Sequence, residues 1–367
     1  CIESRGTLGG TCLNVGCIPS KSLLNLSENY FKAKHFSNLG IEIGSIKLNL
    51  KKMMKNKAES VNILTKGIEF LFKKNKVTYY KGIGSFKSHN QISIIDDKNK
   101  EIVIETDKTI ISTGSEPASL PGIKFDEKLI ISSTEALSLD AVPKKMVVVG
   151  GGYIGLEMGS VWSRLGTKVT VVEALDRIVP NMDGEIANQF MKSLQKQGLE
   201  FKLSHKVVDS KSNTNDVDVA IESLKDKKQI KEKFNVVLLS VGRQPNTEGL
   251  NLDKIGVELT NQKAIKIDKQ FKTNVDGIYA IGDVAPGPML AHKAEEEGVA
   301  CVEIINGQKP HINYDSIPAI VYTNPEIASV GKTEEQLKEA KVDYKVGKFP
   351  FIANGRALTT SSTEGFV

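Results

Sequence analysis

KKMVVVGGGYIGLEMGSVWSRLGTKVTVVE, residues 144–173, is the stretch of the chain that decides the fold. The apolar residues 146–149 predict a short strand buried in a parallel sheet. The spacing G-x-G-x-x-G follows at the start of a predicted helix, on Gly150, Gly152 and Gly155. Residues 169–172 predict the next strand. Strand, glycine turn, helix and second strand together predict half of a dinucleotide-binding fold.

The glycines of this turn would let a cofactor phosphate approach the backbone. A pyrophosphate must approach the backbone closely, and the helix N-terminus, here Tyr153 and Ile154, must face the anion. The carboxylate of Glu173, at the end of the second strand, would accept hydrogen bonds from a ribose 2′-hydroxyl and repel a 2′-phosphate. This predicts NAD rather than NADP. The alternative is a turn that merely tolerates glycine, and the spacing of all four elements disfavours it.

The composition is that of a soluble globular protein. The 367 residues suggest two or three domains, and 40% of them are hydrophobic and 25% charged. The formal net charge of +5 comes from scattered lysines and gives no reason to expect nucleic acid as a partner. No apolar run approaches the ~20 residues of a membrane span. The chain begins at Cys1 and stops at Val367 without a terminating pattern, so we expect a fragment of a longer protein.

Two cysteines lie in the segment GGTCLNVGCIPSK, residues 9–21. In a regular helix the Cα atoms of Cys12 and Cys17 would be roughly 8–9 Å apart, whereas a disulfide needs about 7 Å or less. The pair can bridge only if Gly16 and Pro19 distort the turn. A strained, accessible bridge of this kind is reducible and typical of catalytic or regulatory sites.

The spacing alone leaves other interpretations of this pair open. A structural disulfide, a metal site and two unpaired thiols are all compatible with it. The chain has four Cys and five His and no second close pair of ligands, so we predict no metal site. A structural bridge suits a small secreted domain better than a chain of this length and low cysteine content.

Further segments suggest a second nucleotide site. Glu3 follows an apolar residue and could end the second strand of another nucleotide fold. Residues 273–283 predict a turn and a short buried strand ending in Gly-Asp, where Asp283 could bind a sugar alcohol or cap the helix that follows. Two strand-to-turn exits, at Thr113–Gly114 and Gly242–Arg243, could contact cofactors or could be plain crossovers between domains.

These features together resemble the flavin-dependent pyridine nucleotide-disulfide oxidoreductases, and within them the branch that oxidises dihydrolipoamide. Where a glutathione reductase would show Val-Pro-Lys-Lys, the chain has Ile-Pro-Ser-Lys at residues 18–21. The order and spacing of the motifs, rather than any one of them, make the resemblance specific. The segments that carry it are 12–21, 113–114, 150–157, 241–246, 282–283, 289–298 and 322–326, continuing to Gly365.

The resemblance implies an α/β fold with two Rossmann-like dinucleotide-binding domains, for FAD and NAD, and a truncated α+β C-terminal dimerisation domain. The implied domains are 1–117 for FAD, 118–249 for NAD, 250–316 as a central domain that completes the FAD site, and 317–367 for dimerisation. The FAD domain would lack its N-terminal part, with its first glycine turn, and the dimerisation domain its C-terminal part.

The resemblance also assigns roles to residues. Cys12 would exchange with the substrate thiol and Cys17 would lie nearer the flavin, with Lys21 beside the flavin and paired with Glu157. The implied FAD-binding residues are Glu3, Gly10, Thr11, Lys21, Thr113, Gly114, Asp283, Met289, Leu290, Ala291 and His292. The implied NAD-binding residues are Gly150, Gly152, Tyr153, Ile154, Gly155, Glu157, Glu173, Gly242 and Arg243.

The implied reaction is the oxidation of protein-bound dihydrolipoamide by NAD⁺, in a homodimer that serves the lipoyl domains of 2-oxo-acid dehydrogenase complexes. The family's catalytic base, a His in H-P-x-x-E, and its first glycine-rich FAD turn have no counterpart here, so we expect the isolated chain to retain no FAD and to be inactive. The alternatives are a glutathione reductase-like enzyme or a non-catalytic, nucleotide-binding scaffold subunit. Segments 51–54 and 161–166 favour the mitochondrial matrix, with bacterial cytoplasm as the alternative.

Overall fold

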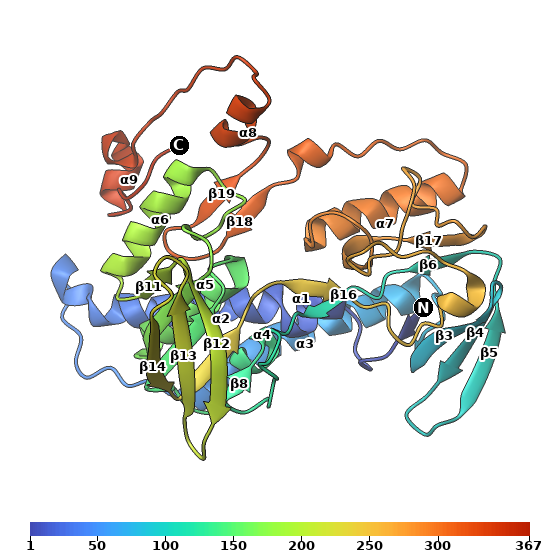
Figure 1. Cartoon of the computed structure of the whole chain (residues 1–367), viewed down its shortest axis with the longest axis horizontal. Helices are drawn as coiled ribbons and strands as arrows, with labels where there is room; N and C mark the ends of the chain where they lie inside the picture. Colours follow the sequence, from blue (N-terminus) through green and yellow to red (C-terminus); the bar gives the residue numbers. More distant parts are fainter. The chain divides into compact units, whose positions relative to one another are not determined.

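The computed structural model describes residues 1–367, and the chain divides into two compact units (Figure 1). Both units combine helices with parallel strands, so the protein has the predicted α/β class. Unit 1 comprises Cys1–Ser22, Met54–Ala118 and Gly242–Ile317. Unit 2 comprises Leu23–Met53, Ser119–Val241 and Pro318–Val367.

A five-stranded parallel sheet forms the centre of unit 2. Its order is β11-β10-β9-β15-β8, and every pairing is parallel. Val147 and Val148 in the central strand are fully buried, because a strand flanked on both sides needs apolar residues on both faces. The predicted strands at 146–149 and 169–172 are confirmed. The strands are β8 (Ile130–Ile131), β9 (Lys145–Val149), β10 (Lys168–Glu173), β11 (Glu200–Leu203) and β15 (Val236–Leu239).

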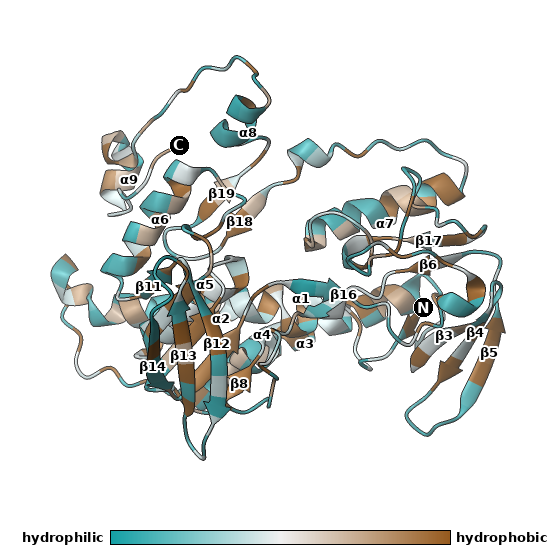
Figure 2. Cartoon of the chain, viewed as in Figure 1, coloured by the Kyte–Doolittle hydropathy of each residue, from teal (hydrophilic) through white to brown (hydrophobic).

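Three helices accompany this sheet: α4 (Ser133–Ala136), α5 (Tyr153–Leu165) and α6 (Gly184–Lys196). Helix α5 begins after Gly152 and ends at Gly166, whose φ of 116° lies in the left-handed region that glycine adopts readily. The buried side of α5 includes Trp162, whose indole N–H donates to the carbonyl of Ala136 at 3.0 Å. Figure 2 shows polar and apolar residues mixed along α6, as expected for a helix with one face on the core.

An antiparallel three-stranded sheet is inserted between β11 and β15. It consists of β12 (His205–Ser212), β13 (Val217–Ser223) and β14 (Gln229–Phe234). Its apolar residues, among them Val219 and Phe234, pack in one buried cluster with Val149 and Leu239 of the parallel sheet. The insertion therefore shares a core with the nucleotide fold.

The C-terminal part of unit 2 is a hairpin followed by short helices: β18 (Ala319–Val321), β19 (Ile327–Ser329), α8 (Glu334–Glu339), η5 (Phe351–Ala353) and α9 (Gly355–Thr359). It is joined to the rest of the unit by polar contacts. Gln197 donates to the carbonyl of Asn324 at 2.6 Å, and Asn324 donates to Glu28. Glu28 in turn pairs with the buried Arg164 of α5, at 3.1 Å.

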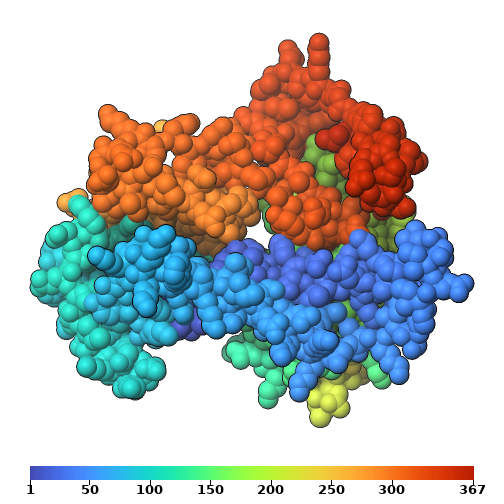
Figure 3. Space-filling view, turned by 180° about the vertical axis from the view of Figure 1, so that it is seen from behind, coloured from blue at the N-terminus to red at the C-terminus, as the bar shows by residue number.

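The boundaries between the two units fall within two long helices. The limit falls after Ser22 within α2 (Cys17–Lys34), and before Met54 within α3 (Leu50–Lys74). The 3₁₀ helix η1 (Phe36–Leu39) follows α2. Figure 3 shows the residues of α3 at the surface, and its Phe70 side chain is 65% exposed. None of the helices combines the length and the apolar character needed to cross a membrane.

Unit 1 contains several small sheets. Two are parallel pairs, β1 (Ile2–Glu3) with β2 (Tyr80–Lys81), and β6 (Thr109–Ile111) with β17 (Ile278–Ala280). The antiparallel sheets are β3 (Ile83–Ser88), β4 (Gln91–Ile95) and β5 (Glu101–Glu105), and the pair β7 (Ser115–Pro117) with β16 (Arg243–Pro245). The helices are α1 (Gly10–Val15), η2 (Asp253–Ile255), η3 (Gly282–Val284), α7 (Ala291–Ile305) and η4 (Tyr314–Ser316).

The core of unit 1 lies around β6 and β17. Ile111, Ile278 and Ala280 are buried together with residues of the β3–β5 sheet. On the other side, Tyr279 of β17 packs with Cys301 of α7, which lies over β17 in Figure 1. This packing brings the start of α7 to the carboxyl end of β17.

Candidate functional site

The redox segment is built around a helix break at Gly16. Cys12 lies in α1, and Cys17 is the first residue of α2. Gly16 has φ −140° and ψ −114°, and a Cβ added there would meet the carbonyl oxygen of Thr11 at 2.9 Å. Glycine is therefore required at this position. The expectation that Gly16 distorts the turn is confirmed, whereas Pro19 lies in the first turn of α2, where proline is tolerated.

Cys12 and Cys17 are thiols in the structure, both half-buried. A hydrogen bond with Cys17 and burial both raise the pKa of the Cys12 thiol, and the charge of Glu295 adds to them. Lys21 acts in the opposite direction, towards the thiolate. The two sulfurs and the Lys21 ammonium therefore interact electrostatically, as a thiol exchange site requires.

Asn14, between the two cysteines, holds the segment in shape. Its side-chain N–H groups donate to the carbonyls of Leu8 at 3.1 Å and Gly10 at 2.9 Å. Its carbonyl oxygen accepts from the Thr7 hydroxyl at 2.9 Å. Sequence reasoning missed this role, because an Asn in a helix gives no signal of which backbone groups it reaches.

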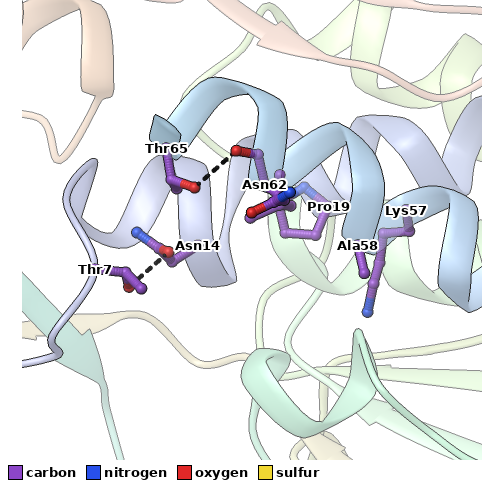
Figure 4. A pocket seen from close by; sticks show the side chains of 8 residues that line it. Thr7, Asn14, Pro19, Lys57, Ala58, Asn62 and Thr65 are labelled. Atoms are coloured by element: carbon purple, nitrogen blue, oxygen red, sulfur yellow. Dashed lines mark hydrogen bonds between the residues drawn. The ribbon is translucent and has the colours of Figure 1, made fainter. Parts of the chain in front are cut away.

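A pocket of about 300 Å³ adjoins the redox segment (Figure 4). Figure 4 shows Thr7 and Asn14 directed at each other on one side, and α3 on the other. Lys57 of α3 is buried, and burial lowers its pKa. The lining residues are Thr7, Asn14, Pro19, Lys57, Ala58, Val61, Asn62 and Thr65.

Several predicted FAD residues lie at strand ends of unit 1. Glu3 ends β1, and its carboxylate accepts from the backbone N–H of Arg5 at 2.8 Å. Gly10 and Thr11 open α1. Thr113 and Gly114 follow β6, at the carboxyl end of a parallel pair where ligands of such sheets bind.

Asp283 follows β17 at the same end of that parallel pair. Its carboxylate accepts from the hydroxyl of the buried Ser115 at 2.5 Å. The Ser115 hydroxyl oxygen accepts from Arg243 Nε at 2.7 Å, and the Ser115 carbonyl accepts from Nη2 at 2.6 Å. Burial lowers the pKa of Arg243, and the charge of Asp283 opposes this shift. Ser115, which the sequence did not single out, links the two charged residues.

The hydrogen bonds of Arg243 with Ser115 bear on the predicted roles of Gly242 and Arg243. Both belong to unit 1, and Arg243 bonds to the strand that carries Ser115. The structure thus groups Arg243 with the residues predicted for FAD. Its predicted contact with NAD stays a prediction.

Residues 289–292 lead into α7. Leu290 is the N-cap residue of α7, and its side chain makes no capping bond. Such a helix start favours an electron-rich group nearby. The helix start, together with the Asp283 carboxylate as an acceptor on the adjacent turn, fits the polar groups of a flavin nucleotide.

In unit 2 the glycine turn has the predicted geometry. Gly150 has φ +107°, and a Cβ on Gly155 would overlap the Gly150 carbonyl and lie 2.5 Å from Ser240 Oγ. One oxygen of Glu173 accepts from the N–H of Gly151 at 2.6 Å, and the other accepts from Leu175 N–H at 2.8 Å. The acid is thus held in the turn, next to the start of α5, and the turn fits a dinucleotide.

Glu157 and Lys21 were predicted to pair. Glu157 is a buried residue of α5 in unit 2, where its carboxylate accepts from the backbone N–H of Tyr322 at 3.1 Å. Lys21 belongs to unit 1. Their pairing stays a prediction.

Comparison with known proteins identifies the family. A model of the pyridine nucleotide-disulphide oxidoreductases matches residues 1–298. The chain belongs to this family. A model of the family's dimerisation domain matches residues 317–367, which supports a homodimer. The protein is therefore an oxidoreductase that uses FAD and NAD, as predicted.

The chain is similar along its whole length to curated members. It is 56% identical to the mitochondrial dihydrolipoyl dehydrogenase of Pisum sativum, and covers 74% of that protein. It is 55% identical to a leghemoglobin reductase of Glycine max, of which it covers 70%. It is 53% identical to the dihydrolipoamide dehydrogenase of Chaetomium thermophilum, of which it covers 73%. All of the chain is aligned in each case.

Solved structures agree on the fold. LpdA from Mycobacterium tuberculosis superposes with a TM-score of 0.91 at 24% identity, over 100% of this chain and 79% of that one. RclA from Escherichia coli, an HOCl-induced flavoprotein disulfide reductase, gives 0.84 at 27% identity, over 100% and 79%. Both comparisons support the fold class expected from the sequence.

Proposed function

We propose that the protein oxidises dihydrolipoamide to lipoamide, with NAD⁺ as the final acceptor. The observation that carries this is the pair Cys12 and Cys17, which are linked by a hydrogen bond across the helix break at Gly16 and lie in the same unit as Asp283. The dihydrolipoyl dehydrogenases among the relatives support the substrate. The segment Ile18–Lys21 favours this branch over glutathione reduction.

The exchange step balances in atoms and electrons once the two substrate thiols have released their protons. A thiolate of the substrate attacks Cys12 Sγ of the oxidised pair, a mixed disulfide forms, and the Cys12–Cys17 bond breaks with Cys17 leaving as a thiolate. The second thiolate of the substrate then attacks the substrate sulfur that is bonded to Cys12, and Cys12 is released. The substrate has lost two electrons and becomes a cyclic disulfide, and the protein holds two reduced cysteines. The raised pKa of the Cys12 thiol favours the return to Cys12 of a proton that a substrate thiol has released.

FAD bound in unit 1 would supply the two-electron chemistry that links the reduced cysteine pair to NAD⁺. Lys21 stabilises negative charge on the cysteine sulfurs, since its ammonium already favours the thiolate form of Cys12. Glu3, Asp283 and the start of α7 hold the FAD. Gly150 and Gly155 admit the NAD pyrophosphate, and Glu173 accepts from the ribose.

We further propose that residues 1–117 and 250–316 form the FAD-binding parts, residues 118–249 the NAD-binding domain and residues 317–367 the dimer interface. The lipoyl domain of a 2-oxo-acid dehydrogenase complex would deliver the substrate, in the mitochondrial matrix. The mitochondrial relatives from plants and from Schizosaccharomyces pombe support that location.

The test uses the protein expressed from its complete reading frame, assayed for NADH formation from dihydrolipoamide. Cys17→Ser should abolish turnover and still bind FAD, because the variant lacks the leaving thiolate but none of the cofactor contacts. Cys1→Ser changes an exposed cysteine and serves as the matched control. Near-normal turnover of Cys17→Ser would exclude the proposed mechanism.

A rival is a reductase for another disulfide or for a haem protein, as the leghemoglobin reductases among the relatives suggest. The same preparation assayed with oxidised glutathione and with ferric leghemoglobin, each with NADH, separates the possibilities. We expect the ratio kcat/KM to be highest for dihydrolipoamide. A higher value for either other substrate would refute the proposal.

A further inference from the structure

Unit 1 contains an almost completely buried ion pair within α7. Lys293 Nζ lies 3.0 Å from Glu297 Oε1, one turn further along the helix, and the two side chains are 1% and 2% exposed. Removing two charges from water is costly, and replacing a buried pair with apolar residues is often neutral or stabilising. The pair therefore calls for a role other than the stability of the helix.

The pair holds both backbone groups of one residue, Gly282. Glu297 Oε2 accepts from the Gly282 N–H at 2.8 Å. Lys293 Nζ donates to the Gly282 carbonyl at 3.1 Å, and to the Pro286 carbonyl at 3.3 Å. The hydroxyl of Tyr314 also donates to Glu297 Oε1, at 2.9 Å, so both carboxylate oxygens have partners. A charged hydrogen bond on each side thus fixes the Gly282 peptide groups.

Gly282 needs such support. Its φ of +71° lies in the left-handed region, and as glycine it has the widest choice of other conformations. It immediately precedes Asp283. Rotation at Gly282 would move the Asp283 carboxylate away from the Ser115 hydroxyl that it now accepts from at 2.5 Å.

The same pair connects two parts of the site. Lys293 lies in the first turn of α7, directly after residues 289–292, and Gly282 lies at the carboxyl end of β17. The ion pair thereby fixes the start of α7 to the turn that carries Asp283.

We propose that Lys293 and Glu297 are positioning residues for FAD: as a buried clamp on Gly282, they hold the Asp283 carboxylate and the N-terminus of α7 in one fixed arrangement that binds the cofactor. This rests on the proposed roles of Asp283 and residues 289–292 in FAD binding. The clamp touches neither the substrate nor NAD. Its loss should thus weaken cofactor binding and leave NAD binding unchanged.

The experiment compares variants of the protein expressed from its complete reading frame. Lys293→Met and Glu297→Met each remove one side of the clamp. Glu297→Gln keeps an acceptor for the Gly282 N–H. Glu296→Gln is the matched control, since it removes an exposed carboxylate one residue earlier. Because a single buried charge could prevent folding, the double variant Lys293→Met/Glu297→Met is included, in which no unpaired charge is left.

Two readouts are independent of turnover: the FAD dissociation constant after removal and re-addition of FAD, and hydrogen exchange at the Gly282 amide in the FAD-free protein. We expect the double variant and Glu297→Met to bind FAD at least tenfold more weakly, with faster exchange at Gly282. Glu297→Gln should lose less FAD affinity than Glu297→Met, and Glu296→Gln should lose none. NADH affinity, which we expect to depend mainly on the glycine turn and Glu173 of unit 2, should be unchanged in the double variant.

Wild-type FAD affinity and wild-type exchange at Gly282 in the double variant would overturn the inference. Equal losses in Glu297→Gln and Glu297→Met would also contradict it, because the retained acceptor should matter. Neither readout involves dihydrolipoamide. A protein that needs the clamp for FAD but oxidises another thiol would thus refute the proposed function alone.

Discussion

Two glycines of the same helix should respond to alanine in opposite directions. In α5, a Cβ on Gly155 would overlap the Gly150 carbonyl and lie 2.5 Å from Ser240 Oγ and 2.9 Å from a methyl group of Val148. One turn later, a Cβ on Gly159 would meet its nearest neighbour at 3.4 Å, which is an ordinary van der Waals contact. The substitution is chemically identical at the two positions, so only the packing differs.

The magnitudes follow from these contacts. Alanine in place of glycine inside a helix contributes up to about 1 kcal/mol of stability. Overpacking at Gly155 costs about 1–3 kcal/mol, and displacement of the Ser240 hydroxyl from the Val149 carbonyl costs about 1 kcal/mol more. Gly155→Ala should therefore destabilise unit 2 by about 1–3 kcal/mol, whereas Gly159→Ala should stabilise it by up to about 1 kcal/mol.

Thermal unfolding and NADH titration measure both effects. At about 2–4 °C per kcal/mol for a unit of this size, the Tm should fall by roughly 2–12 °C for Gly155→Ala and rise slightly for Gly159→Ala. NADH affinity should fall about tenfold in Gly155→Ala, equivalent to about 1.4 kcal/mol, because the Gly150 carbonyl must move. Equal Tm values for the two variants, or unchanged NADH affinity in Gly155→Ala, would refute the close packing of α5 on the turn.

Three further perturbations test other parts of the structure. Glu173→Arg should weaken NAD binding and favour NADP, and an unchanged preference measured by kcat/KM would show that Glu173 does not meet the ribose. Arg164→Met should destabilise unit 2 by about 3–5 kcal/mol in urea unfolding, because Glu28 is left beside a buried apolar side chain; a loss below about 1 kcal/mol would contradict this. Burial raises the pKa of Cys301 to about 11 from an ordinary 9.0, so the unfolded chain releases this proton first and stability should decline from about pH 9 to 11. Cys301→Ala should flatten that decline, and identical pH profiles would exclude the effect.

The nucleotide fold of unit 2 could be predicted from residues 144–173 because its signals are local. Each strand and the helix between them is encoded by consecutive residues, and Gly150 to Glu173 lie within one supersecondary unit. The helix break at Gly16 could be predicted for the same reason. Its glycine, the two cysteines and Pro19 are all within a few positions of one another.

The contacts around Asp283 in unit 1 could not be predicted in this way. Ser115 reaches Asp283 across 168 positions of sequence, and Arg243 reaches Ser115 across 128. No periodicity encodes such pairs, since they depend on which strands become neighbours. The ion pair of Lys293 and Glu297 was similarly hidden, because two charges four positions apart normally indicate a solvated helix face.

The hydrogen bond from Gly151 to Glu173 has a consequence for engineering the enzyme. The same carboxylate that would select the cofactor also holds the glycine turn in shape before any cofactor arrives. Selectivity and preorganisation are thus carried by one side chain, and exchanging it for a cation changes both at once. A variant designed to accept a 2′-phosphate needs a second substitution that returns an acceptor to the Gly151 amide, and cofactor exchange at this site should proceed through paired rather than single changes.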